Sequence, residues 1–106
     1  MAPAPWDPEN PLEFEATHPY VRTFWTAYVG PSAVADYLRL VRAAEKDSAI
    51  KRPRSLARLA RHQLARVTKE GLEVRMTVPP LSVAQVMRLT PSVRRMHAAW
   101  RIQHPR

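Results

Sequence analysis

"LARVTKEGLEVRMTVPP", residues 64–80, contains the clearest secondary-structure pattern of the chain. Within it, apolar and polar side chains alternate from residue 72 to residue 78, which predicts a strand with one buried face. Gly71 closes a short turn before this strand, and a turn of this length joins two antiparallel strands. We therefore expect a β-hairpin at about residues 64–78, ended by two consecutive prolines.

Helical segments are predicted on the N-terminal side of this hairpin. Residues 20–29 place their aromatic and apolar side chains on one helical face, and Pro31 suits the first turn of a second helix over about 31–46. A shorter helix is expected over about residues 54–62, with Ser55 as its N-cap. Together these segments predict a mainly α fold with one β-hairpin, in the α+β class.

Two short helices are predicted after the hairpin, in residues 81–101. Thr90-Pro91 separates them, because proline favours the start of a helix and disfavours helix at the preceding residue. Ser82 is the expected cap of the first helix. The side chains expected to face inward from the two helices are Val83, Val86, Met87, Val93, Met96 and Trp100. The whole core is expected to gather Phe24, Trp25, Tyr37, Leu38, Val41, Leu56, Leu59, Val74, Met76, Val86, Met96 and Trp100.

The first 17 residues differ from the rest of the chain in composition. They contain four prolines and four acidic residues but no basic residue, and proline lacks the backbone N–H that regular elements use. We therefore expect residues 1–17 to form an extended arm without regular secondary structure, followed by one small basic domain over residues 18–106. Apolar anchors in such an arm can contact a partner subunit, and the candidates are Trp6, Leu12 and Phe14.

The chain carries a net charge of +8, and arginine supplies 14 of its 17 basic residues. Residues 48–106 contain thirteen basic residues and only two acidic ones. Most of these arginines therefore lack an acidic partner nearby in the sequence, and a polyanion would relieve their mutual repulsion. The asymmetry indicates an anionic partner, with nucleic acid, and DNA in particular, as the first candidate.

The end of the chain resembles a known DNA-binding motif. Residues 82–89, followed after a short turn by "SVRR" at residues 92–95, resemble the helix-turn-helix of the excisionase and MerR-type regulators. The resemblance covers a fifth of the chain, and Thr90-Pro91 stands where that family has a longer, glycine-containing turn. It implies a recognition helix that presents its first turn to the major groove.

A second stretch looks like part of a winged-helix module. The expected helices over 31–46 and 54–62 precede the hairpin over 64–78, and residues 18–29 would serve as the first of three helices. The winged-helix resemblance implies an arginine-bearing helix against the DNA backbone and the hairpin turn as the wing tip. From both patterns, the residues expected to contact nucleic acid, chiefly through its phosphates, are Arg52, Arg54, Arg58, Arg61, Lys69, Ser92, Arg94, Arg95 and Arg101.

The patterns typical of catalytic and metal sites are absent from the sequence. Only two glycines exist, so no glycine-rich phosphate loop is present, and the four histidines lack metal-ligand spacing. His97 is expected at the flank of the core rather than as a ligand. The acidic residues cluster in the N-terminal arm, where nothing rigid would hold a catalytic pair. We expect a non-enzymatic protein without a metal, cofactor or small-molecule substrate.

Cysteine is absent and the apolar runs are only a few residues long, so neither a disulfide framework nor a membrane span is expected. We expect a cytoplasmic protein, or a virion component if it belongs to a phage particle. Two functions stay open. The first is a small nucleic-acid-binding protein, and the second is a structural subunit of a large assembly, a virion or a ribonucleoprotein particle, that binds its neighbours through residues 1–17.

Overall fold

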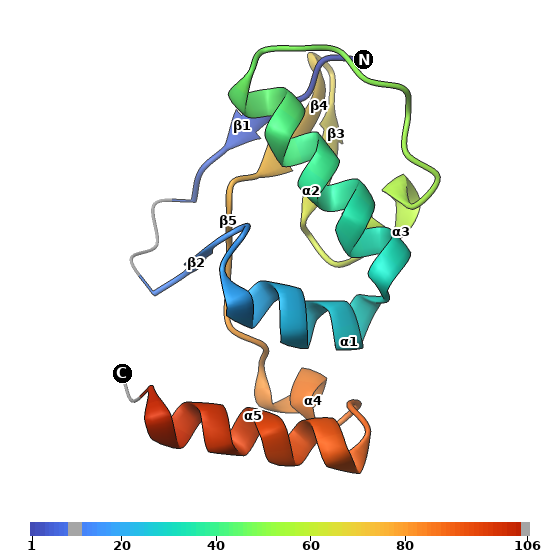
Figure 1. The fold of residues 1–106 in the computed structure, drawn as a ribbon. Helices are drawn as coiled ribbons and strands as arrows, with labels where there is room; N and C mark the ends of the chain where they lie inside the picture. Colours follow the sequence, from blue (N-terminus) through green and yellow to red (C-terminus); the bar gives the residue numbers. More distant parts are fainter. Residues whose placement is uncertain (9–11, 105–106) are drawn as a thin grey trace.

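The structure, a computed structural model, describes residues 1–8 and 12–104 (Figure 1). Its elements, in chain order, are β1 (Ala4–Trp6), β2 (Phe14–Glu15), the π-helix η1 (Val21–Trp25), α1 (Thr26–Val29), α2 (Pro31–Glu45), α3 (Leu56–Arg61), β3 (Ala65–Thr68), β4 (Gly71–Arg75), β5 (Thr77–Val78), α4 (Val83–Val86) and α5 (Pro91–Gln103). The α+β class is therefore confirmed. No helix within the described ranges is long and apolar enough to cross a membrane.

The predicted β-hairpin is confirmed and lies in a three-stranded sheet with the order β1-β4-β3. β3 and β4 are antiparallel, with Thr68 opposite Gly71 across the two-residue turn. Gly71 has a φ of +131°, a backbone conformation that side-chain-bearing residues rarely adopt, which explains a glycine at this position. β5 leaves this sheet and pairs antiparallel with β2 in a second, two-stranded sheet.

The expectation that residues 1–17 form no regular element is wrong for the residues described there. β1 pairs in parallel with β4, where Pro5 lies opposite Val74, and β2 pairs with β5, where Phe14 lies opposite Val78. Proline is tolerated in β1 because this strand is at the edge of its sheet and needs hydrogen bonds on one side only. The leader is therefore extended, as expected, but it extends along the protein's own hairpin.

A buried ion pair fastens this leader to the hairpin. The Glu13 carboxylate lies 2.5 Å from Nη2 of Arg75, and the two side chains are 2% and 13% exposed. Glu13 also accepts hydrogen bonds from Nε of Arg75 at 3.1 Å and from the Thr77 hydroxyl at 2.9 Å. Because both partners of a buried pair are desolvated, removing either one leaves an uncompensated charge. The leader is thus held by charge as well as by strand pairing.

The hydrophobic core lies where α2 crosses the three-stranded sheet, as Figure 1 shows. The helix predicted over 31–46 is confirmed as α2, and the Tyr37 hydroxyl on its inner face donates to the backbone carbonyl of Arg75. The predicted core residues that are buried are Phe24, Trp25, Tyr37, Val41, Leu56, Leu59 and Val74. Those that are half-buried and pack against this core are Leu38, Met76, Val86 and Trp100.

The chain turns from α3 into the hairpin through a residue in the left-handed region. Gln63 has a φ of +62°, and Leu64 donates its N–H to the Leu59 carbonyl at 2.9 Å, which completes a Schellman-type helix end. At the other end of α3, Ser55 occupies the predicted N-cap position but does not act as a cap through its side chain. The Ser55 side chain makes no capping hydrogen bond, and its backbone N–H instead donates to the Asp36 carboxylate at 3.1 Å.

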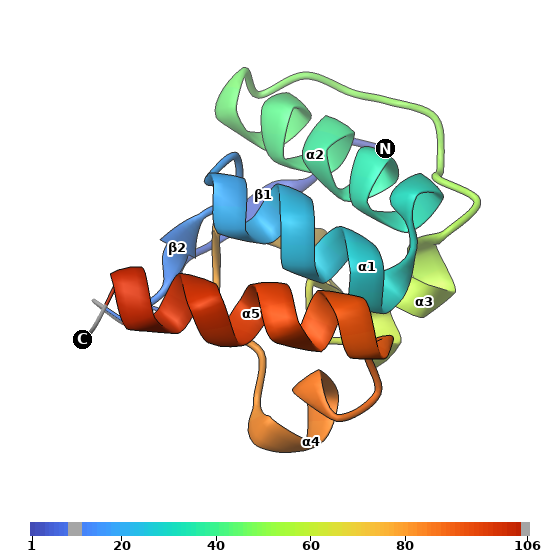
Figure 2. The same ribbon diagram turned by 60° about the horizontal axis from the view of Figure 1, so that its bottom comes forward.

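The two C-terminal helices form a separate layer against α1 (Figure 2). Their predicted starts are confirmed, since Ser82 caps α4 and Pro91 occupies the first turn of α5, but α4 ends at Val86 and is shorter than the predicted helix over residues 82–89. Ser82 forms a full capping box with Gln85, and the Thr90 hydroxyl accepts from the N–H of Val93.

The inner faces predicted for these helices are wrong in part. Val83 and Met87 are 79% and 62% exposed, because α4 is a single turn and the chain buries Leu81 and Leu89 on either side of it instead. In α5, Met96 is 53% exposed. Its neighbour in sequence, His97, is the buried residue of this helix.

Candidate nucleic-acid interface

The charges of the two arginines of α3 act on a half-buried histidine directly after that helix. The His62 ring meets the Tyr28 ring of α1 edge-on, with centroids 5.2 Å apart. Burial lowers the pKa of His62, and the charges of Arg61, Arg58 and Arg88 lower it further. Three cations therefore lie close enough to His62 to act on its titration. We call Arg58, Arg61, His62 and Arg88 the basic cluster.

The basic cluster joins the two regions that resemble DNA-binding motifs. Arg58 and Arg61 belong to α3, whereas Arg88 belongs to the turn between α4 and α5. Figures 1 and 2 both place α3 and the beginning of α5 on the same side of the molecule. The two regions therefore lie on the same side of the molecule, with α1 between them in Figure 1. Arg88 was not among the predicted contacts, because the helix-turn-helix resemblance implies contacts from the second helix, whereas residue 88 falls in the segment expected to form the first.

The cations of this cluster are available to an anion. Arg58, Arg61 and Arg88 are exposed, and the structure shows no carboxylate partner for them anywhere in the part of the chain that it describes. Arg58 is held in place, because its Nη1 donates to the Val29 carbonyl at 3.2 Å. A guanidinium that is oriented in advance loses less conformational freedom when it binds a phosphate.

The other predicted contacts are distributed more widely. Arg52 and Arg54 are exposed in the loop before α3, and Ser92 and Arg95 are exposed on the first turns of α5. Lys69 is exposed at the hairpin turn, which Figure 1 places at the end of the molecule opposite α5. The structure therefore does not bring Lys69 together with the α5 residues.

The two remaining predicted contacts face apolar surroundings. Arg94 is half-buried and, with Arg101, lines a groove between α4 and α5 whose apolar residues include Val83 and Met87. Arg101 also lines a pocket at the far end of α5. Both arginines are thus placed differently from the open helix face that the sequence suggested.

Two of the three predicted partner anchors are used inside the chain. Trp6 is half-buried, with the Arg66 guanidinium 4.0 Å above its ring and that of Arg75 at 5.4 Å. Phe14 is 3% exposed and stacks on Tyr20 with ring centroids 4.4 Å apart. Leu12 is 58% exposed and lies at the rim of the pocket beside α5.

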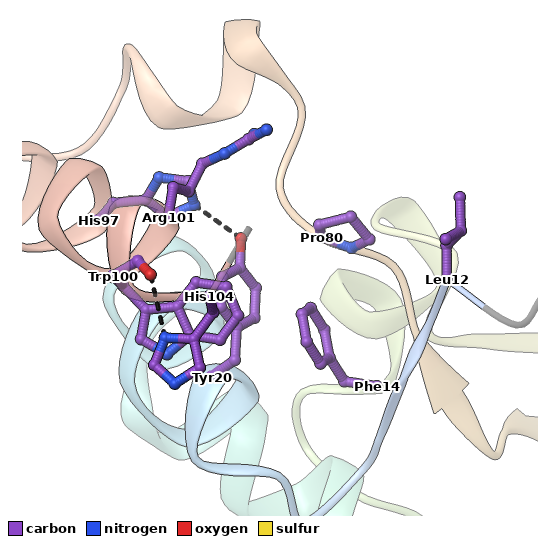
Figure 3. A pocket seen from close by; sticks show the side chains of 8 residues that line it. All are labelled: Leu12, Phe14, Tyr20, Pro80, His97, Trp100, Arg101 and His104. Atoms are coloured by element: carbon purple, nitrogen blue, oxygen red, sulfur yellow. Dashed lines mark hydrogen bonds between the residues drawn. The ribbon is translucent and has the colours of Figure 1, made fainter. Parts of the chain in front are cut away.

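That pocket is enclosed mainly by aromatic rings (Figure 3). The leader contributes Leu12 and Phe14, the segment before η1 contributes Tyr20, and the chain before α4 contributes Pro80. The α5 residues that complete the wall are His97, Trp100, Arg101 and, directly after the helix, His104. Four segments distant in sequence thus meet at one cavity.

A hydrogen-bonded tyrosine anchors α5 at this cavity. The Tyr20 hydroxyl lies 2.7 Å from Nε2 of His97 and accepts the N–H of Leu81 at 2.9 Å. Burial raises the pKa of Tyr20, and burial lowers that of His97, which the charge of Arg101 lowers further. Both shifts favour the uncharged form of each side chain at this buried contact.

Across residues 1–8 and 12–104, no group of three or more potential metal ligands comes together. Comparison with protein-family models, curated proteins and solved structures finds no match for the chain.

Proposed function

We propose that the protein binds nucleic acid, with duplex DNA as the first candidate, through contacts to phosphates and without catalytic activity. The observation that carries this proposal is the basic cluster, in which the charges of Arg58 and Arg61 from α3 and of Arg88 from the turn before α5 all act on His62. Each guanidinium can offer paired N–H donors to phosphate oxygens, which makes such a cluster well suited to a phosphate backbone. The net charge of +8 adds long-range attraction to the same partner.

We further propose a winged-helix-like arrangement for the segment from η1 to β4. Its order of helices followed directly by the hairpin is the order expected for such a module. In this arrangement the exposed side of α3, with Arg58 and Arg61, faces the backbone. The hairpin turn with Lys69 contacts phosphates farther along the duplex.

Contacts to phosphates fit this surface better than the reading of bases. α3 has six residues, and apart from its two buried leucines these are two alanines and two arginines. Base reading needs a helix inserted into a groove with side chains that match donor and acceptor patterns, whereas phosphate binding needs only positive charge at the right spacing. We therefore expect affinity that depends strongly on salt and weakly on DNA sequence.

The test is fluorescence anisotropy with a labelled duplex over a range of salt concentrations. In the double variant Arg61→Gln/Arg88→Gln, affinity should fall, because two guanidinium groups no longer neutralise phosphates. The slope of log affinity against log salt should decrease by about 0.9 for each phosphate that the variant leaves unneutralised. Arg58 is left unchanged because its hydrogen bond to Val29 also supports the fold.

The matched control is Arg22→Gln/Arg42→Gln. These two arginines are exposed and line one shallow groove beside α2, so the control removes the same charge elsewhere. If both double variants lower the slope equally, net charge and not the basic cluster determines binding. If the unmodified protein shows no salt-dependent binding to duplex DNA, the proposal is wrong.

The alternative, a structural subunit of a large assembly, has narrower support. Trp6 and Phe14 pack within the chain, so exchange of the leader between subunits would have to break the Glu13–Arg75 ion pair. The observation in its favour is the exposed apolar surface of Val83 and Met87 at α4. Light scattering after size-exclusion chromatography distinguishes the two, because only the assembly role requires association in the absence of nucleic acid.

A further inference from the structure

The aromatic pocket beside α5 has the size of a small ring system. Its volume is about 210 Å³. An apolar cavity of about 150 Å³ accommodates benzene, whereas sites for drug-sized molecules begin at about 300 Å³. The cavity therefore suits one or two fused rings.

The walls of the pocket favour a flat aromatic ligand. The Trp100 indole meets Phe14 edge-on at 5.7 Å and lies 4.8 Å from Tyr20, so the three rings pack against one another and form one wall of the pocket. Trp100 also stacks on His104 at 4.3 Å, and His104 donates from Nδ1 to the Trp100 carbonyl at 3.0 Å. These contacts hold the rings in place before a ligand arrives, which reduces the entropy lost on binding.

The charge at the pocket is positive. Figure 3 shows the Arg101 side chain extending from α5 toward the side where Pro80 lies. Burial raises the pKa of Tyr20 and lowers that of His97, and the charge of the same arginine opposes the first shift and adds to the second, so it acts on the interior of the pocket. The structure shows no carboxylate partner for Arg101 within the described residues. A ligand with an anionic group would supply one.

We propose that this pocket binds a small planar aromatic carboxylate, with its ring against the wall formed by Phe14, Tyr20 and Trp100 and its carboxylate on Arg101. The apolar walls exclude strongly hydrated ligands, and Arg101 disfavours cations. The volume excludes nucleotides and peptides as complete occupants. This site lies at the end of α5 opposite the turn that carries Arg88, so it is separate from the proposed nucleic-acid interface.

Such a ligand would join segments that now meet only through side chains. It would contact the leader through Phe14 and the last turns of α5 through Trp100 and Arg101. A ligand that binds only the assembled state stabilises that state in proportion to the logarithm of its concentration over Kd. The bound ligand is therefore expected to stabilise the packing of α5 against the rest of the protein.

The test uses indole-3-carboxylate and its neutral analogue indole-3-carboxamide, titrated by calorimetry and by NMR. The unmodified protein should bind the carboxylate at one site and shift the signals of Trp100 and His104. Arg101→Gln should weaken the carboxylate about tenfold, because a charge-assisted hydrogen bond is lost. The carboxamide should bind about as weakly as the carboxylate binds to the variant, and should be unaffected by Arg101→Gln.

The control variant is Arg42→Gln, which removes one exposed arginine from α2 and should leave the Kd of the carboxylate unchanged. Arg101 is exposed, so its replacement is not expected to unfold the chain, and circular dichroism checks this. The proposal is overturned if the carboxylate shows no saturable binding in the millimolar range, if Arg101→Gln leaves its Kd unchanged, or if the shifted signals lie away from α5.

Discussion

The hairpin side of the molecule and its C-terminal helix pair are held together by different contacts. On the hairpin side, α2, α3 and β4 bury aliphatic side chains completely, among them Leu40, Leu59 and Val74, each 0% exposed. In the C-terminal pair, α4 buries no residue and α5 buries only His97. The pair is attached through aromatic rings, through the Tyr20 hydrogen bonds and through Leu81 and Leu89 on either side of α4.

Both proposed sites lie at the junction between the hairpin side and the C-terminal helix pair. The basic cluster combines α3 with the turn before α5, and the aromatic pocket combines the leader and Tyr20 with the end of α5. A junction that is held by few contacts can open or shift at a lower free-energy cost than a packed core. We therefore expect α5 to respond to ligands, to pH and to mutation more readily than the hairpin side does.

The largest effect is expected on the hairpin side, from Glu13→Ala. The change leaves the Arg75 guanidinium buried without its carboxylate and should lower the free energy of unfolding by about 3–5 kcal/mol. Urea denaturation measures this, with Glu15→Ala as the control because Glu15 is an exposed neighbour in the same leader. A decrease no larger than that of the control would mean that the attachment of the leader contributes little to the stability of the protein.

The hairpin side is also the region that could best be predicted from the sequence. Its signals are local, since strand alternation in residues 72–78 and the helical periodicity of residues 31–46 each specify one element. The pairing of β1 with β4 could not be predicted, because the two strands are far apart in sequence and prolines normally argue against a strand. Proline is tolerated in β1 because this strand is at the edge of the sheet, but the edge position is known only from the folded structure.

The candidate sites could be predicted less well than the fold. Arg58 and Arg61 were found from their spacing on α3, whereas Arg88 and the pocket depend on contacts between distant segments. On α5 the pattern favoured Met96 over His97 as the inward residue because methionine is the more apolar. The folded protein buries His97 because Tyr20 supplies a hydrogen-bond partner, which offsets the cost of burying a polar ring.

Trp100→Ala tests whether the C-terminal pair opens independently. The indole is half-buried, so its removal should cost about 1–3 kcal/mol, less than for a fully buried tryptophan. In native-state hydrogen exchange, amides of α5 should become about 10- to 100-fold less protected while amides of β4 change little. An equal decrease in protection in β4 would show that the two regions unfold as one unit, and the contrast between them would disappear.

The pH dependence of α5 should follow His97. Its pKa is lowered by burial and by Arg101, so the unfolded chain binds a proton more readily than the folded protein does. Stability is therefore complete above pH 6.5, the ordinary value, and falls as the pH drops below it, by at most about 1.4 kcal/mol per pH unit. His62, whose pKa is also lowered, contributes in the same direction. Denaturation at several pH values should show a shallower slope in His97→Gln than in the unmodified protein, with His62→Gln measured to separate the two histidines.

The smallest effect is expected from Met96→Ser, which distinguishes the two possible inner faces of α5. If Met96 faced the core, replacing it with serine would cost about 2–5 kcal/mol, as for other buried large-to-small changes. Because Met96 is 53% exposed, we expect a change within about 0.5 kcal/mol, measured by urea denaturation beside Trp100→Ala. A destabilisation comparable to that of Trp100→Ala would mean that Met96 faces the core, as periodicity alone favours. In that orientation of α5, His97 and Arg101 would not line the pocket. A neutral result would support the orientation that the Tyr20 hydrogen bond selects, on which the proposed aromatic-carboxylate site depends.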